Sequence, residues 1–233
     1  MTTNSHQPET GGGRLIVAID GPSGAGKGTV ARAVAARLGY RHVDTGAMYR
    51  AVAWNGVRHG VDLQDESAVV ALASGSVIDV SDGAVTVDGH DVKAAIRTPE
   101  IDAAAAAIAR LPRVRQVLIV QQRAMGAAGG VVMEGRDIGT VVFPAADVKV
   151  YLDASPEERA RRRATDVTHA AGRGTTAVAE VASALEARDN SDRTRAASPL
   201  KEAPDALRID TTGVPVDEVV AQVLSLVKGR SRS

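Results

Sequence analysis

The sequence predicts an α/β fold with about five parallel strands, flanking helices and a small antiparallel insertion. Short runs of β-branched and apolar residues alternate along the chain with longer segments of helical periodicity, which is typical of a parallel sheet wound with helices. The first run, LIVAID at 15–20, lacks an alternating polar face and therefore indicates a strand buried on both sides. The stretch 77–92 instead alternates apolar and polar residues, which is typical of antiparallel hairpins.

The strands and helices can be placed in order along the chain. Each expected strand is short and apolar, and the five lie at 15–20, 41–44, 131–134, 148–153 and 207–210. The expected helices carry Ala, Leu and Arg at helical spacing and lie at 29–38, 66–73, 101–109, 156–163 and 216–227, with another that begins near Thr175. The helix at 29–38 stops before Gly39, a residue type that commonly ends helices.

One domain is expected at 15–230, after a disordered tail at 1–14 that is polar and Gly-rich. Within this domain, the pairs Asp82-Gly83 and Asp88-Gly89 are hairpin turn signals, and they fall in the insertion expected at about 63–105. The Gly- and Thr-rich stretch after 156–163 suits a mobile cover over a site, so a lid is expected at about 157–176.

Composition excludes several classes of protein. The 233 residues include no Cys, which removes disulfide scaffolds, zinc-thiolate sites and cysteine nucleophiles. Lys and Arg number 28, as do Asp and Glu, and only five residues are aromatic, so neither a global basic field nor a base-stacking platform for nucleic acid is expected. No run approaches the roughly 20 apolar residues of a membrane span, and the N-terminus lacks a secretory pattern, so a cytoplasmic protein, by default a monomer, is expected.

A glycine-rich segment follows the first strand and precedes the first helix. Its sequence, GPSGAGKGT, comprises Gly21, Pro22, Ser23, Gly24, Ala25, Gly26, Lys27, Gly28 and Thr29. Successive backbone N–H groups and a helix N-terminus cradle phosphates in such a loop, and its lysine reaches the terminal phosphates of a nucleotide. The segment therefore predicts an ATP-binding phosphate loop, although Gly28 replaces the hydroxyl that usually ligates Mg²⁺ and Thr29 follows instead.

Five segments in order carry a resemblance to one family. They are GPSGAGKGT, DTGAMYR at 44–50, PRVR at 112–115, EGRDIGT at 134–140 and RDNSDRTR at 188–195. Together they resemble the bacterial cytidylate kinases, which are phosphate-loop (P-loop) nucleoside monophosphate kinases, over about 15–227. The resemblance implies the fold of that family and ATP-dependent phosphorylation of CMP and dCMP to CDP and dCDP by direct in-line transfer, with Mg²⁺ accompanying ATP, in pyrimidine nucleotide metabolism.

The resemblance also implies roles for individual residues. Lys27, Arg136 and Arg188 would be catalytic. Thr45, Arg50, Arg115, Arg136, Asp137, Arg188, Asp192 and Arg195 would bind CMP. The basic cluster 159–163 leads into the lid, so Arg159 or Arg163 would meet ATP phosphates, while Glu134, at the end of a strand, would lie near Mg²⁺.

The chemistry of these residue types supports the same roles. Phosphoryl transfer to an ionised phosphate needs charge neutralisation and in-line positioning, which arginines on separate loops can supply. A carboxylate such as Asp137 accepts from the amino group of cytosine but repels the carbonyl of uracil, and Arg115 is its donor counterpart. Arg188, Asp192 and Arg195 are spaced to share one helix face, either as a substrate clamp or as a solvated salt-bridge ladder.

Other functions stay open at this stage. A kinase of another acceptor, such as UMP or shikimate, would keep the fold and change only the acceptor site. A GTP-binding switch protein would share the phosphate loop, but the NKxD and DxxG segments of that class are absent. The five histidines show no metal-binding spacing, so no transition-metal site is expected.

Overall fold

The computed structural model describes residues 14–165 and 178–230, and its centre is the expected five-stranded parallel sheet. The strands are β1 (Ile16–Asp20), β2 (Arg41–Asp44), β6 (Val131–Gly135), β7 (Val148–Asp153) and β8 (Leu207–Asp210), in the order β2-β6-β1-β7-β8. All four pairings are parallel. The strand predictions are confirmed to within one residue at each end.

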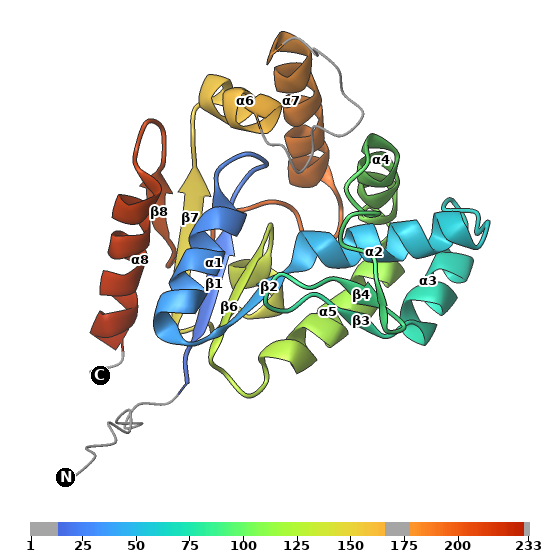
Figure 1. Cartoon of the computed structure of the whole chain (residues 1–233), viewed down its shortest axis with the longest axis horizontal. Coiled ribbons are helices and arrows are strands. Elements are labelled where there is room, and N and C mark those ends of the chain that lie inside the picture. Colours follow the sequence, from blue (N-terminus) through green and yellow to red (C-terminus); the bar gives the residue numbers. More distant parts are fainter. Residues whose placement is uncertain (1–13, 166–177, 231–233) are drawn as a thin grey trace, which may run out of the picture.

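Helices cover both faces of this sheet (Figure 1). They are α1 (Lys27–Leu38), α2 (Thr45–Arg58), α3 (Glu66–Gly75), α4 (Pro99–Ile108), α5 (Pro112–Gly126), α6 (Pro156–Thr165), α7 (Val178–Thr194) and α8 (Val216–Arg230). Val17 and Ile19 of β1 pack in a core with α1 and α8, whereas Ala18 between them packs in a second core with α2 and α5. This alternation explains why the first strand is apolar throughout, since both of its faces are buried.

Two helices had not been expected from the sequence. Helix α2 begins inside the DTGAMYR segment, where Asp44 accepts a hydrogen bond of 2.9 Å from the backbone N–H of Ala47 and so caps the helix. Helix α5 begins at Pro112, in the position where proline is favoured because its missing N–H has no helical partner. Both segments had been interpreted for their motif residues alone, although each carries a helix-start signal of its own.

The insertion contains the expected antiparallel sheet, with β3 (Ile78–Asp79), β4 (Thr86–Val87) and β5 (His90–Asp91) in the order β3-β4-β5. Asp82, Gly83, Asp88 and Gly89 all have positive φ, as the predicted turns require. Beyond β3, Ser81 forms one antiparallel bridge with Val43 of β2, and the Asp82 side chain accepts a 3.1 Å hydrogen bond from the backbone N–H of His42. The insertion is therefore tied to the edge of the central sheet.

Two of the predicted regions lie largely outside the part of the chain that the structure describes. Residues 1–13 of the expected tail and 166–177 of the expected lid lie outside the described residues. Within the described ranges, none of the helices has the length and apolar character that a membrane span requires.

Candidate functional site

A cleft of about 1610 Å³ opens at the carboxyl ends of the sheet strands. Helices α6 and α7 stand beyond these ends, and α4 faces α7 across the cleft (Figure 1). The cavity exceeds the roughly 300–1,000 Å³ of a typical small-molecule pocket, so it has room for two nucleotides. Of the site residues predicted from the sequence, all line this cleft except Arg159 on α6 and Gly21 and Pro22 at the start of the phosphate loop.

Charge is concentrated in this cleft. Its described lining contains twelve Lys and Arg against seven Asp and Glu, whereas the whole chain has a formal net charge of +0. The basic residues come from the phosphate loop, the insertion, the loop after β6, and helices α1, α2, α5, α6 and α7. The arrangement suits ligands that carry several negative charges.

The phosphate loop wraps tightly at the N-terminus of α1. Gly24 and Gly26 have φ of 80° and 87°, and a Cβ at Gly24 would lie 2.9 Å from the backbone oxygen of Arg159, so both conformation and space demand glycine there. Lys27 is buried, and its Nζ donates a 2.6 Å hydrogen bond to the Pro22 carbonyl. Burial, reinforced by the nearby Arg136 guanidinium, lowers the pKa of Lys27 to about 7. The negative charge of a bound phosphate would counteract both the burial and the repulsion from Arg136, and would raise the pKa of Lys27 again.

Glu134 borders the position where the general loop motif has its hydroxyl. A Cβ at Gly28 would lie 3.1 Å from Oε1 and 3.5 Å from Oε2 of Glu134. The described residues contain no group of three or more His, Asp and Glu that could hold a metal ion by themselves. This single buried carboxylate beside the phosphate loop nevertheless fits Mg²⁺, which is commonly held by one or two carboxylates, water and substrate phosphates.

Arg115 and Asp137 form a buried pair that lines the cleft beside α5. The Arg115 guanidinium donates to the Asp137 carboxylate at 2.6 Å, and the Arg115 side chain is 2% exposed. The Tyr49 ring lies 5.3 Å from the Arg115 guanidinium, where it restricts the arginine from the other side. Tyr49 had not been predicted as a site residue, although it belongs to the DTGAMYR segment.

The triplet on α7 faces the cleft and is not a solvated ladder. Asp192 accepts from Arg136 at 3.0 Å and from Arg195 at 3.0 Å, so it joins α7 to the loop after β6. Arg188 lines the same cleft, and burial together with the Arg136 charge lowers its pKa to about 10. Arg195 lies just after α7, which ends at Thr194, so only the first two members of the triplet are helical.

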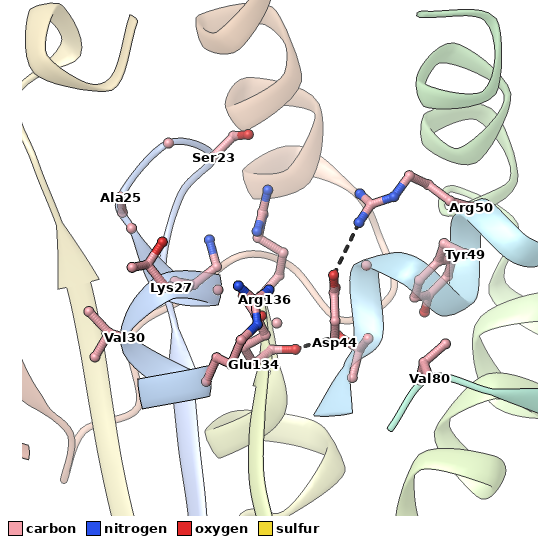
Figure 2. A pocket seen from close by; sticks show the side chains of 18 of the residues that line it. Ser23, Ala25, Lys27, Val30, Asp44, Tyr49, Arg50, Val80, Glu134 and Arg136 are labelled. Atoms are coloured by element: carbon pink, nitrogen blue, oxygen red, sulfur yellow. Dashed lines mark hydrogen bonds and ion pairs between the residues drawn. The ribbon is translucent and has the colours of Figure 1, made fainter. Parts of the chain in front are cut away.

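The first half of α2 contributes another arginine to the cleft. Arg50 is buried and pairs with Asp44 at 3.3 Å, and the two side chains meet at the edge of the cleft (Figure 2). Thr45 donates its hydroxyl to the Glu134 carbonyl at 2.7 Å, a bond that ties α2 to β6. Arg136 lies between the Asp44–Arg50 pair and Lys27 of the phosphate loop (Figure 2).

The arginines of the basic cluster on α6 contact different partners. Arg159 points away from the cleft, where it is buried against Asp189 and donates to the Ser23 carbonyl at 3.1 Å. Arg163 lines the cleft but donates to Asp102 of α4 at 2.9 Å. Arg162, which had not been singled out, lines the cleft and donates to Thr211 at 2.9 Å.

Two buried carboxylates behind the site had not been predicted. Asp20 accepts from the backbone N–H groups of Ile138 at 2.9 Å and Gly139 at 2.7 Å, and burial raises its pKa to about 6. It thereby holds the N-terminus of a short π-helix, η1 (Ile138–Val142), which follows Arg136 and Asp137 directly. Asp189 accepts from the backbone N–H of Ser23 at 3.1 Å. An aspartate ending a buried strand is a sequence signal that could have indicated Asp20.

Comparisons with known proteins agree with this geometry. The profile of the cytidylate kinase family matches residues 17–229. A cytidylate kinase from Solibacter usitatus is 46% identical over 217 residues, covering 93% of this chain and 94% of its own. One from Pelotomaculum thermopropionicum is 47% identical over 222 residues, covering 93% and 97%. A solved structure of an uncharacterized protein from Eubacterium ventriosum is similar in fold, with a TM-score of 0.50, 9% identity, and coverage of 92% of this chain and 99% of its own. The chain belongs to the cytidylate kinase family.

Proposed function

We propose that this protein transfers the terminal phosphoryl group of ATP to CMP and dCMP, giving CDP and dCDP. The observation that carries the proposal is the cleft itself, in which a phosphate loop faces the buried Arg115–Asp137 pair across a group of arginines. Relatives named cytidylate kinase, about as long as this chain, support the same activity.

The acceptor would bind on the side of α2, α5 and α7. Asp137 would accept from the amino group of cytosine, and Arg115 would donate to an acceptor atom on the base. The ring of Tyr49 and the salt bridge between Arg115 and Asp137 hold this pair in place before substrate arrives. Asp192 would meet the ribose hydroxyls, with Arg195 beside it. Arg50, Arg136 and Arg188 would hold the acceptor phosphate.

The donor would bind over the phosphate loop. Backbone N–H groups of 23–29 and the N-terminus of α1 would cradle its phosphates, and Lys27 would move from the Pro22 carbonyl to the transferred group. Arg136 and Arg188 would neutralise charge on that group while it passes between the two nucleotides. Glu134 would lie at the water shell of the Mg²⁺ that accompanies ATP, and this metal would supply charge neutralisation for the phosphates. Arg163 would reach ATP phosphates by leaving Asp102.

A coupled assay of ADP release across a panel of acceptors tests this proposal. CMP and dCMP should be turned over, and CMP should exceed UMP in kcat/KM by about 5- to 150-fold, which corresponds to about 1–3 kcal/mol for one good discrimination at a base edge. Shikimate should give no turnover above background. Lys27→Ala should lose phosphoryl transfer while its circular dichroism spectrum stays that of the wild type, because the lysine acts on the charge of the transferred group.

Either of two results would overturn the proposal. Equal kcat/KM for CMP and UMP would remove the assigned base recognition. Wild-type kcat in a folded Lys27→Ala protein would remove ATP from the phosphate loop. GTP binding without turnover of any acceptor would instead favour a switch protein.

A further inference from the structure

His42 on β2 contacts the carboxylate of Glu134 on the neighbouring strand β6. Its Nε2 lies 3.0 Å from Oε1 of Glu134, and the two side chains are 3% and 9% exposed. The register of the two strands pairs His42 with Val132. Glu134 is two residues further along β6, so the ring reaches it diagonally across the two strands. Both residues line the cleft.

The hydrogen-bond network assigns the proton on this ring. Nδ1 of His42 is buried and has no partner among the described residues. A proton on Nδ1 would be a buried donor without an acceptor, which costs more than an unused lone pair on the aromatic ring. The ring therefore carries its proton on Nε2 and donates it to Oε1 of Glu134.

The insertion fixes the backbone from which this ring projects. Asp82 Oδ1 accepts from the His42 N–H at 3.1 Å, and the Asp82 N–H donates to the His42 carbonyl at 3.0 Å. His42 is thus held between β6 on one side and the 81–84 turn on the other. A donor held on both sides imposes a direction on the carboxylate that it contacts.

The Glu134 carboxylate that His42 contacts also faces the phosphate loop, and Oε1 is the nearer of its two oxygens to Gly28. Gly28 leaves room for the carboxylate there, since a Cβ at that position would lie 3.1 Å from Oε1. With no hydroxyl at position 28, Glu134 is the group that borders the place where a metal would meet the loop. A glutamate has several rotatable bonds, so an unrestrained carboxylate would spread over several positions.

We infer that His42 is a positioning residue that directs Glu134 toward the water shell of the Mg²⁺ bound with ATP. The inference rests on the proposed function, because it takes ATP and its metal to bind at this loop. Partners that orient the metal-facing group typically change metal affinity by 10- to 100-fold when they are removed. His42 touches no substrate in this scheme, and its whole effect passes through the carboxylate.

Metal affinity, measured apart from turnover, tests the inference. Mn²⁺ serves as the probe, and its binding to the full-length protein with a non-hydrolysable ATP analogue is followed by electron paramagnetic resonance. His42→Phe, which keeps a ring but loses the donor, should weaken Mn²⁺ binding about 10- to 100-fold. His42→Gln, which keeps an N–H donor, should restore affinity to within a few-fold of wild type. His42→Met provides a second variant without the donor if the His42→Phe protein does not fold.

A double-mutant cycle with Glu134→Gln separates the inference from a general packing effect. Glu134→Gln should weaken Mn²⁺ binding by itself, and adding His42→Phe to it should weaken binding no further. Unchanged Mn²⁺ affinity in both folded donorless variants would overturn the inference, as would a full extra loss in the Glu134→Gln background. Unchanged affinity in Glu134→Gln would remove the carboxylate from the metal site and the inference with it. CMP turnover by the wild type, assayed separately, decides whether the proposed function itself fails.

Discussion

At the scale of single residues, the candidate site depends on charged groups held out of water before any ligand arrives. Lys27 is the clearest case, because its ammonium group is buried and lies near another cation. Both conditions disfavour its charged form. Phosphate oxygens supply the opposite charge, so nucleotide binding and protonation of Lys27 should favour each other.

We expect nucleotide binding to take up protons near neutral pH. The pKa of Lys27 is lowered to about 7, so the free protein at pH 8 has mostly lost this proton and the complex regains it. Uptake should approach about one proton at pH 8 and become small at pH 6, where the free lysine is already charged. Isothermal titration calorimetry of an ATP analogue in buffers of different ionisation enthalpy measures this number.

The matched control for proton uptake is Lys27→Met, which keeps most of the side-chain volume. It should bind the analogue more weakly and lose the uptake. A wild-type protein whose binding enthalpy is independent of the buffer at pH 8 would contradict this account of Lys27.

The acceptor clamp gives a second prediction for a single side chain. Asp192→Ala removes a partner of Arg136 and Arg195 and, in the proposed complex, the contact with the ribose hydroxyls. We expect kcat/KM for CMP to fall about 10- to 1000-fold, the range for lost substrate orientation, and by less for dCMP because one hydroxyl is missing. Glu186→Ala, an exposed carboxylate on the same helix, should change neither. Wild-type kinetics of Asp192→Ala on both substrates would show that this aspartate does not bind the substrate.

At the scale of elements, short segments are aligned by buried carboxylates that join them. Asp20 ends β1 and holds the first N–H groups of η1, so the strand that leads into the phosphate loop also sets the position of the loop that carries Arg136 and Asp137. Asp189 on α7 holds Ser23 in the same way. The phosphate loop and the loop that carries Arg136 and Asp137 are thereby held by neighbouring elements.

Asp20→Ala tests this alignment. It leaves two buried N–H groups without acceptors, each of which costs about 1–3 kcal/mol, so urea unfolding should show a loss of about 2 kcal/mol or more. The KM for CMP should rise as well, because Arg136 and Asp137 directly precede η1 in the chain. Asp147→Ala is the matched control, since Asp147 accepts the backbone N–H of Ile16 at 2.7 Å in an exposed position. An Asp20→Ala protein that loses stability but keeps its KM for CMP would reduce Asp20 to a purely structural group.

Regular elements could be predicted from the sequence because their signals are local. A buried parallel strand such as β1 is a nearly continuous apolar run, and the Asp-Gly turns need only positive φ at adjacent residues. Helices α2 and α5 were missed because their segments had been interpreted through motif residues alone. The π-helix could not be expected, since its N–H groups are satisfied by Asp20, a residue 118 positions earlier in the chain.

The candidate site also has features that could be predicted from the sequence and features that could not. Motif residues such as Lys27 and Asp137 were predicted because the resemblance fixes them by type and spacing, and the fold places them in one cleft. Pairings across the fold were not predictable, because they depend on which helices meet. The partners of Arg159 and Arg163 are on α7 and α4, and neither partner is marked by its own sequence neighbourhood.

At the scale of the whole molecule, the chain has no net charge, but its basic and acidic residues are unevenly distributed over the fold. The excess of basic over acidic groups in the described lining of the cleft is balanced by acidic groups elsewhere. Low-dielectric walls concentrate such a field and draw multivalent anions toward the cleft. The affinity for nucleotides should therefore depend on ionic strength even though the net charge is +0.

We expect kcat/KM for CMP to fall about tenfold when NaCl is raised from roughly 50 to 500 mM, because salt at these concentrations screens exposed and half-exposed charges. Cytidine, which lacks the phosphate, is the control ligand, and its weak binding should change little over the same range. Stopped-flow or steady-state rates at constant pH provide the measurement. A salt-independent kcat/KM for CMP would show that the net field of the cleft contributes nothing to capture.

The tie between the insertion and β2 also bears on how this protein behaves at high concentration. A terminal strand of a sheet offers unpaired backbone groups to any other chain, which is a common route to aggregation. Ser81 and Asp82 already occupy the backbone of β2 at Val43 and His42, so a foreign strand cannot pair with the β2 edge at these two residues. At the other margin, β8 is four residues long and carries Arg208 and Asp210, charges that discourage strand addition. The contact between Asp82 and His42 therefore has two effects. It fixes the backbone of a residue that lines the cleft, and it covers part of the sheet edge against pairing with another chain.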